Sequence, residues 1–415
     1  MMIRSFPASL LIPILVLIPA LSLHAQEADE EKPGSFEIEG YAVVNYHKYW
    51  WQTDPARRAN VDIERLAVEP SYQLSKNIRL EAEVEFEHGG TGASMEFDRF
   101  EEFGEYEQEI EKGGEVSVEK VAAVIAIAPE LNVRIGHFYV PIGLINSNYE
   151  PSDYFTTQRS EAEAALIPST WHETGVELFG MVGPLRYQAL VVNGLDATGF
   201  TSSTWIVRGH QGRFEMVNAE NLAFAGRLDY PVGDEGVVGL SGYFGNSADN
   251  RPKPDLTVPA HVAIGDFHAS LVEGPLTVRG VLLYGTLQNA GQVSKANRSL
   301  SNNLNAKRTP VGSAALGAFV EAGYDILSFF PHAPSDTDAP QRLDIFGRFD
   351  YYDSMFETDE EIFDNPRWER RVWRAGINWH LHPQLVLKGE FVHRTLGLPS
   401  DNREESFSLG MGFQL

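Results

Sequence analysis

The residues best suited to chemistry in this sequence lie in one stretch, residues 141 to 171. Its charged side chains are Glu150, Asp153, Arg159, Glu161 and Glu163. A few fixed charges at the narrowest part of a channel decide which ions pass. If this stretch borders a water-filled passage, these five residues are the candidate constriction.

An enzymatic interpretation of the same region depends on Ser169, His172 and Glu173. A serine nucleophile needs a base within hydrogen-bond reach and a third group that orients this base. The Gly-x-Ser-x-Gly sequence of many hydrolases is absent from the chain. Because serine, histidine and glutamate often fall close together by chance, we expect no enzyme. An outer-membrane hydrolase remains the less favoured alternative.

The elements that position these residues are predicted to be β-strands of an exported chain. Residues 1–25 have the features of a signal peptide, with an apolar stretch from Leu10 to Leu21 and Ala25 at the cleavage position. Residues 26–34 predict a short periplasmic lead-in, and residues 35–415 predict a single barrel domain. No later segment has the roughly 18 uncharged apolar residues that a membrane helix requires, so any membrane span must be made of strands.

Apolar and polar residues alternate in many segments, among them Ile78 to Phe86 and Leu222 to Tyr230. Short turns such as Gly183-Pro184 alternate along the chain with long polar connections such as residues 89 to 113, as periplasmic turns and extracellular loops do in outer-membrane barrels. We therefore predict an all-β fold, a transmembrane antiparallel β-barrel of about 16 strands, with an inward-folded third loop. Residues 325 to 340 break this order and leave the count uncertain by two strands. The last strand, Phe407 to Leu415, is expected to pair with the first.

With apolar faces toward lipid, the opposite strand faces form the predicted pore lining. These residues are Arg79, Glu81, Glu83, Arg134, Arg186, Arg227, Arg279, Asp344, Arg348 and Arg374. Unpaired charges are costly to desolvate, so this interior is expected to hold water. In the alternative interpretation, neighbouring arginines and carboxylates only pair and brace the wall. Likewise, the stretch 141–171 would bury Phe155, Leu166, Ile167 and Trp171 against the inner wall and narrow the pore. Alternatively, it would pack over the mouth of the barrel as an extracellular lid.

The composition narrows the possible partners. The chain has 58 acidic and 33 basic residues, a net charge of −25, which argues against nucleic acid. It has no cysteine, so thiol chemistry and disulfides are excluded. We expect no cofactor and no metal. The acidic run within residues 96 to 119 lacks the spacing of a calcium loop and is interpreted as a solvated charge run. The less favoured alternative is that it binds divalent cations that also bridge lipopolysaccharide.

Four elements of the central region resemble the phosphate-selective porin family: Gly136 to Leu144, Phe155 with Arg159, a Leu-Ile-Pro element, and Gly175 to Gly180. The resemblance implies a sixteen-stranded homotrimeric porin with an inward third loop. Members that select phosphate have a ladder of basic residues along the pore, whereas this chain has scattered arginines among more numerous carboxylates. His172-Glu173 also stands where the family often has a basic pair. A weakly cation-preferring or solute-general pore therefore fits the charge better.

The function expected from these features is passive diffusion of small hydrophilic solutes or ions through an outer-membrane porin. Its surroundings would be the lipid bilayer and lipopolysaccharide of a Gram-negative outer membrane. A competing hypothesis from another class is an exported soluble β-rich protein that binds carbohydrate on its aromatic side chains. Osmotic shock distinguishes the two, because it releases a soluble periplasmic protein and leaves a barrel in the membrane.

Overall fold

The structure is a computed structural model that describes residues 32–98, 107–210, 217–300, 308–330 and 341–415. The predicted signal peptide and the lead-in as far as residue 31 lie outside these residues. Within the described ranges, no helix is long and apolar enough to cross a membrane.

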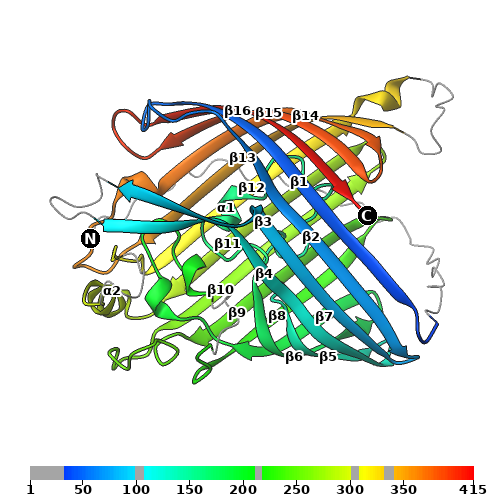
Figure 1. The fold of residues 1–415 in the computed structure, drawn as a ribbon, viewed down its shortest axis with the longest axis horizontal. Helices are drawn as coiled ribbons and strands as arrows, with labels where there is room; N and C mark the ends of the chain where they lie inside the picture. Colours follow the sequence, from blue (N-terminus) through cyan, green and yellow to red (C-terminus); the bar gives the residue numbers. More distant parts are fainter. Residues whose placement is uncertain (1–31, 99–106, 211–216, 301–307, 331–340) are drawn as a thin grey trace, which may run out of the picture. The chain divides into compact units, whose positions relative to one another are not determined.

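Sixteen antiparallel strands of the described chain form one closed barrel (Figure 1). The strands are β1 Phe36–Trp51, β2 Asn60–Ser75, β3 Ile78–Asp98, β4 Glu107–Ala128, β5 Leu131–Tyr139, β6 His172–Val182, β7 Leu185–Asn193, β8 Leu222–Val232, β9 Gly236–Asn246, β10 His261–Glu273, β11 Leu276–Leu287, β12 Ala314–Asp325, β13 Arg342–Glu357, β14 Glu369–His382, β15 Leu385–Leu396 and β16 Arg403–Gln414. Each strand pairs with its neighbours in chain order. The barrel closes where β16 pairs with β1, with Tyr41 opposite Gln414 and Trp51 opposite Glu404. The predicted fold class, the strand count and the closing pair are confirmed.

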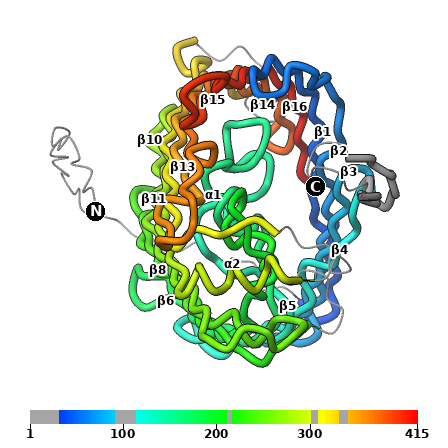
Figure 2. The backbone as a smooth tube through the Cα atoms, turned by 90° about the vertical axis from the view of Figure 1, so that its left-hand side faces the viewer, coloured from blue at the N-terminus to red at the C-terminus, as the bar shows by residue number. Residues whose placement is uncertain are grey.

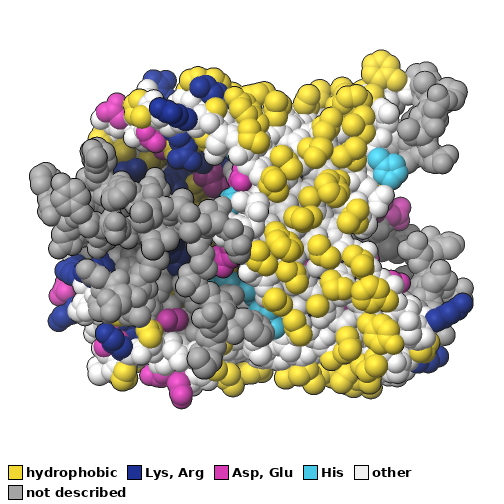
Figure 3. All heavy atoms as spheres, viewed as in Figure 1, with side chains coloured by type: hydrophobic (Ala, Val, Ile, Leu, Met, Phe, Trp, Pro, Cys, Tyr) yellow, Lys and Arg dark blue, Asp and Glu magenta, His cyan; other side chains and the backbone are white. Residues whose placement is uncertain are grey.

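The outward face of the barrel is apolar (Figure 3). Strand β9 illustrates the alternation. Leu240 and Phe244 are exposed, while Ser241 and Tyr243, which lie between them in the strand, are buried in the interior. Successive side chains of a strand point to opposite faces, so the exposed residues share the outer face. A closed sheet has no unpaired edge, and an apolar exterior of this kind is stable against lipid.

The connection expected between the third and fourth strands is shorter than the sequence predicts. Residues 89 to 113 were expected to form a long polar loop, but most of their backbone continues the β3–β4 ladder, with Met95 opposite Ile110. Backbone pairing does not require an apolar face, so polar strands can extend a hairpin. Most of the predicted solvated acidic run falls in this hairpin, where the side chains of residues 91 to 113 lie outside the described part of the structure.

Part of the interior is a packed apolar core. The connections after β5, β7, β9 and β11 contribute Trp171, Phe200, Trp205, Ala260 and Val293, each fully buried. They pack with inward residues of β7 to β12. Figure 2, which looks along the barrel, shows helix α1 (Glu161–Ala164) within the ring of strands, and Figure 1 shows helix α2 (Ala290–Arg298) at one end of the barrel. The expectation of a water-filled interior is therefore wrong for this part, because the loops supply the apolar side chains that the strand pattern does not reveal.

Candidate functional site

The candidate site is loop 3, defined here as residues 140–171 between β5 and β6. The loop is rich in apolar side chains, and Phe155, Leu166, Ile167 and Trp171 are at most 4% exposed. These four were expected to bury against the inner wall, and their burial is confirmed. Because so much of the loop is apolar, it is more stable when packed than when extended into water.

The first part of loop 3 is bound to the wall formed by β8, β9 and β10. Arg227 of β8 donates hydrogen bonds from Nη1 to the carbonyl oxygens of Pro141 and Gly143, at 3.3 and 2.6 Å. The Gly143 amide donates in turn to Ser241 Oγ and Asp266 Oδ2, both at 3.1 Å. Gly143 has φ +73°, and a Cβ there would lie 2.3 Å from Glu163 Oε1, so the position requires glycine.

The middle of loop 3 reaches the wall on the other side, formed by β15 and β1. Lys388 of β15 donates from Nζ to the carbonyl oxygens of Tyr154 and Thr156, at 2.6 and 3.0 Å. Thr157 donates to Glu390 Oε1 at 2.7 Å, and its carbonyl accepts from Asn45 of β1 at 3.3 Å. The loop therefore crosses the inside of the barrel, with partners on both sides.

An aromatic contact fixes loop 3 against β12 and β13. The Phe155 ring stacks on Phe346 of β13, with centroids 5.5 Å apart and an interplanar angle of 11°. Arg279 of β11 lies 4.8 Å from the centroid of the Phe155 ring. Gly323 of β12 faces the same ring so closely that an added Cβ would lie 2.2 Å from Phe155 Cζ. The absence of a side chain at this position makes room for the ring.

Two of the five predicted constriction residues hold the loop together instead of facing a passage. Glu163 is 1% exposed, and its Oε1 accepts the amides of Leu144 and Ile145 at 2.8 and 3.1 Å. Arg159 is also buried, and it donates to the Tyr41 hydroxyl at 2.7 Å. The expectation that these two side chains project into an aperture is wrong. The loop needs internal partners for its own backbone and for the wall, and these residues supply them.

The other three predicted constriction residues remain partly accessible. Glu161 forms ion pairs with Arg374 and Arg394, each at 2.5 Å. Glu150 and Asp153 are half-buried, and the Asp153 carboxylate accepts the Glu150 amide at 3.2 Å. Burial, together with repulsion from Asp153, raises the pKa of Glu150 to about 7. Only these three of the five can contact a solute in this arrangement of the loop.

The predicted pore-lining residues divide into two groups on the inner face. Those at least partly exposed are Arg79, Glu81, Arg134, Arg186 and Arg279. Those buried are Glu83, Arg227, Asp344, Arg348 and Arg374. Each buried member has an oppositely charged partner within ion-pair distance, which compensates for its lost hydration.

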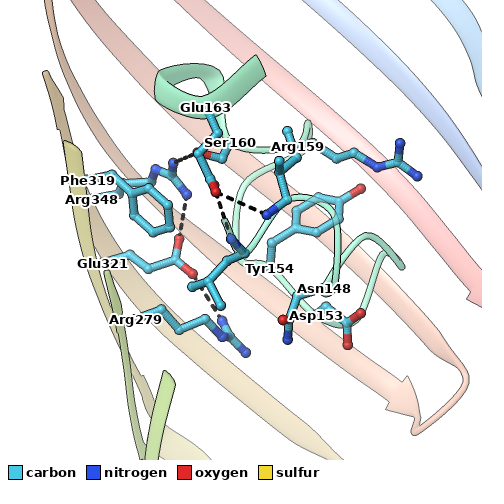
Figure 4. Close-up of a pocket in the computed structure, with 12 residues that line it drawn as sticks. Asn148, Asp153, Tyr154, Arg159, Ser160, Glu163, Arg279, Phe319, Glu321 and Arg348 are labelled. Carbon is cyan, nitrogen blue, oxygen red and sulfur yellow. Dashed lines mark hydrogen bonds and ion pairs between the residues drawn. The ribbon is translucent and has the colours of Figure 1, made fainter. Parts of the chain in front are cut away.

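Arg348 shows how a buried charge on this wall is compensated. Its guanidinium pairs with Asp350 at 2.6 Å and Glu321 at 3.0 Å, and it donates to Ser160 of loop 3 at 2.8 Å. Figure 4 shows Glu321 between Arg348 and Arg279, with Ser160 beside Arg348. For such residues the bracing interpretation applies, and the wall charges also anchor the loop.

Ser169, His172 and Glu173 each have other partners. The Ser169 hydroxyl accepts a hydrogen bond from Arg159 at 3.3 Å. His172 Nδ1 is 2.6 Å from His137 Nε2, and the Glu173 carboxylate accepts from the Trp171 indole at 3.2 Å. None of the hydrogen bonds described for this region joins two of these three residues.

The sequence did not single out several residues that hold loop 3. Tyr41, Tyr352 and Arg394 all contact it from inward positions of strands. Their common signal is a large polar side chain on the inner face of a strand. That signal is weak, because the same residue types also occur near the barrel ends.

Comparisons with known proteins identify the fold. No family model matches the chain. It is 26% identical over 373 residues to an uncharacterized protein of Aquifex aeolicus, covering 88% of this chain and 77% of that protein. At this identity, the relative does not establish a family, and the resemblance to phosphate-selective porins gains no support.

Solved structures with a similar fold are outer-membrane porins and channels. They include an anion-selective porin from Comamonas acidovorans, with TM-score 0.53, 9% identity and coverage of 92% of this chain and 100% of that one. The channel DcaP of Acinetobacter baumannii has TM-score 0.53 and 10% identity, covering 92% and 98%. OmpF of Salmonella typhi has TM-score 0.53 and 11% identity, again covering 92% and 98%. The chain therefore has a porin-type barrel fold.

The contact between Gly323 and Phe155 predicts a position-specific effect of a single methyl group. Gly323→Ala should displace the Phe155 ring and lower the free energy of unfolding by about 1–3 kcal/mol, the usual cost of overpacking. Gly347→Ala is the matched control, because an added Cβ there meets no atom within 4 Å. Denaturant unfolding of both variants in detergent measures the difference. Equal stabilities would contradict the placement of Phe155.

The burial of Glu163 predicts a pH-dependent stability. Burial outweighs the two amide hydrogen bonds and raises the pKa of Glu163 to about 7. The folded-state pKa of Glu163 is above the unfolded-state value, which is near 4.5. Its contribution to stability is therefore fully present below pH 4.5 and is lost as the pH rises through 7. Glu163→Gln keeps an acceptor for both amides without the charge. This variant should match wild type near pH 4.5 and exceed its unfolding free energy by up to about 3 kcal/mol at pH 8. A constant difference at all pH values would contradict the assignment.

Proposed function

We propose that this protein is a channel of the Gram-negative outer membrane, through which small hydrophilic solutes or ions diffuse passively. The observation that carries the proposal is the inverted polarity of the barrel. Its outer face is apolar, whereas its inner face carries the charged residues and loop 3. An apolar exterior around a charged interior is stable in lipid, whereas a soluble carbohydrate-binding protein would expose that apolar surface to water. The inverted polarity therefore favours the membrane channel.

A group of carboxylates on loop 3 and on β1 and β2 favours a pore with a weak preference for cations. Glu39 of β1 lies directly opposite Glu69 of β2 in the sheet. Lys120 pairs with Glu69 at 3.2 Å. Loop 3 adds Glu150 and Asp153, and after burial the repulsion from Asp153, Glu69 and Glu39 contributes to the raised pKa of Glu150. Fixed negative charge of this kind attracts cations and repels anions at the passage.

The surroundings and assembly follow from the same proposal. Residues 1–25 would direct export, and the apolar exterior would contact the bilayer and lipopolysaccharide. A homotrimer is proposed because one solved neighbour of similar fold, OmpT of Vibrio cholerae, is described in a trimer form. We propose no enzymatic activity, cofactor or metal for the chain. Phosphate selectivity is not part of the proposal, because the comparisons give no support to the phosphate-selective family.

Planar-bilayer recordings test the channel and its preference together. Wild type should conduct in potassium chloride and show a small reversal potential of cation-selective sign under a salt gradient. Replacing two of the carboxylates, as Glu39→Gln with Asp153→Asn, should lower the cation-to-anion permeability ratio by roughly twofold. Asp234→Asn, in the exposed turn before β9, is the control and should leave the ratio unchanged.

Three outcomes would contradict parts of this proposal. Release of the protein from the periplasm by osmotic shock, or no conductance from folded barrels, would exclude the channel. Conductance with an unchanged reversal potential in the double variant would leave the channel intact and show that these carboxylates do not face the passage.

A further inference from the structure

We propose that the inner wall of β13, β14 and β15 contains a binding site for carboxylate-bearing solutes, and that Glu161 of loop 3 occupies this site as an internal ligand. The inference rests on the proposed channel function, since a solute must reach the interior to bind. We call the group Tyr352, Arg370, Arg374 and Arg394 the arginine site.

The arginine site binds both carboxylate oxygens of Glu161. Arg374 Nη2 lies 2.5 Å from Glu161 Oε2, and Arg394 Nη2 lies 2.5 Å from Glu161 Oε1. The Tyr352 hydroxyl also donates to Oε1. Guanidinium groups that approach a carboxylate from two sides give strong and geometrically specific recognition. The three donors come from three adjacent strands, so the rigid sheet fixes their spacing.

Neighbouring carboxylates orient the two arginines that bind Glu161. Arg374 Nη1 is 3.3 Å from Glu390, and Arg394 Nη1 is 2.6 Å from Glu404. Arg374 is buried, and Tyr352 is 1% exposed. The donors therefore stay in place whether or not Glu161 is present. A site whose donors are held by other groups is preorganised for its ligand.

Arg370 gives the site a cation without a matching carboxylate. It donates to the Tyr352 hydroxyl at 3.2 Å. Among the described residues no carboxylate lies within ion-pair distance of Arg370, and its buried Nε has no hydrogen-bond partner. A solute carboxylate beside Tyr352 would satisfy this group, which Glu161 leaves unpaired.

Aromatic side chains beside the arginines define the rest of the ligand. The Arg394 guanidinium lies 5.3 Å from the centroid of the Trp51 ring, and Arg370 lies 5.3 Å from that of Trp368. Both indoles are only half-buried. Flat apolar surface next to a guanidinium accepts a ring or a short apolar body. The ligand class is therefore a small carboxylate attached to a flat or apolar group.

Glu161 is a replaceable occupant because it belongs to loop 3 and not to the wall. It starts a four-residue helix that has no side-chain hydrogen bond at its N-cap. Burial would raise its pKa, but Arg394 and Arg374 outweigh that effect and hold the pKa below its ordinary value, so the residue is ionised. A solute carboxylate has the same charge and the same two oxygens as Glu161. It can therefore form the same ion pairs and hydrogen bonds and compete with Glu161 for the arginine site.

Calorimetric titration of the full chain, folded in detergent, with benzoate tests the proposal. Removing the internal ligand as Glu161→Ala should tighten benzoate binding about tenfold or more relative to wild type. Benzamide, which has the same ring without the charge, should not show this gain. Adding Arg370→Gln to Glu161→Ala should reverse most of it. Adding Arg371→Gln is the matched control, because Arg371 is the next residue of β14, has a side chain 52% exposed and lies on the opposite face.

The outcomes separate this site from the channel itself. If Glu161→Ala binds benzoate no better than wild type, or if Arg371→Gln matters as much as Arg370→Gln, the arginine site is overturned even when the barrel conducts. If binding behaves as expected but no conductance appears, the site stands and the proposed channel fails. Should Glu161→Ala not fold, as judged by a heat-dependent gel shift, Arg370→Gln alone should weaken benzoate binding in the wild-type background, and no change would overturn the site.

Discussion

Charge compensation between loop 3 and the inner wall is the constraint on which the rest of the interior depends. A barrel with an apolar exterior must place its charged residues inside, and desolvated charges without partners would destabilise it by several kcal/mol each. Loop 3 supplies hydroxyls, carbonyl oxygens and carboxylates to these charges. Lys388, for example, is buried among strand residues, but two loop carbonyls accept its hydrogen bonds. The loop is thus stabilised by the wall, and the wall charges are compensated by the loop.

The two sides of loop 3 carry groups of different charge. On the side of Glu39 and Glu69, its half-buried carboxylates join an acidic wall. On the side of the arginine site, one glutamate is paired with two guanidinium groups. A solute crossing the barrel would therefore meet basic and aromatic groups at one stage and acidic groups at another. Such an order of charges bears on selectivity more than the net charge of the chain does.

The architecture was predictable from the sequence because each strand carries its own signal. Alternation assigns one face of a segment such as Leu222–Tyr230 to lipid without any knowledge of its neighbours, and loop lengths give the order of turns. The interior was less predictable, because contacts there join residues far apart in the chain. Glu163 and Arg159 had the right type for a constriction, but nothing local indicates that backbone amides and Tyr41 take up their hydrogen-bonding capacity. Likewise, the burial of Arg348 depends on Ser160, 188 residues away.

Loop 3 lies across the barrel, with Ser152 donating to Gln414 of β16, and we propose that the loop limits the passage. An engineered disulfide tests it directly, since the chain has no cysteine of its own. A Cβ at Gly410 would lie 3.5 Å from Thr157 Cβ, a separation that a disulfide can span. Thr157→Cys with Gly410→Cys should cross-link on oxidation. At pH 8, where ionised Glu163 weakens the loop packing, the cross-linked protein should conduct less than the same protein after reduction. Failure to cross-link, or equal conductance in the two forms, would contradict the account.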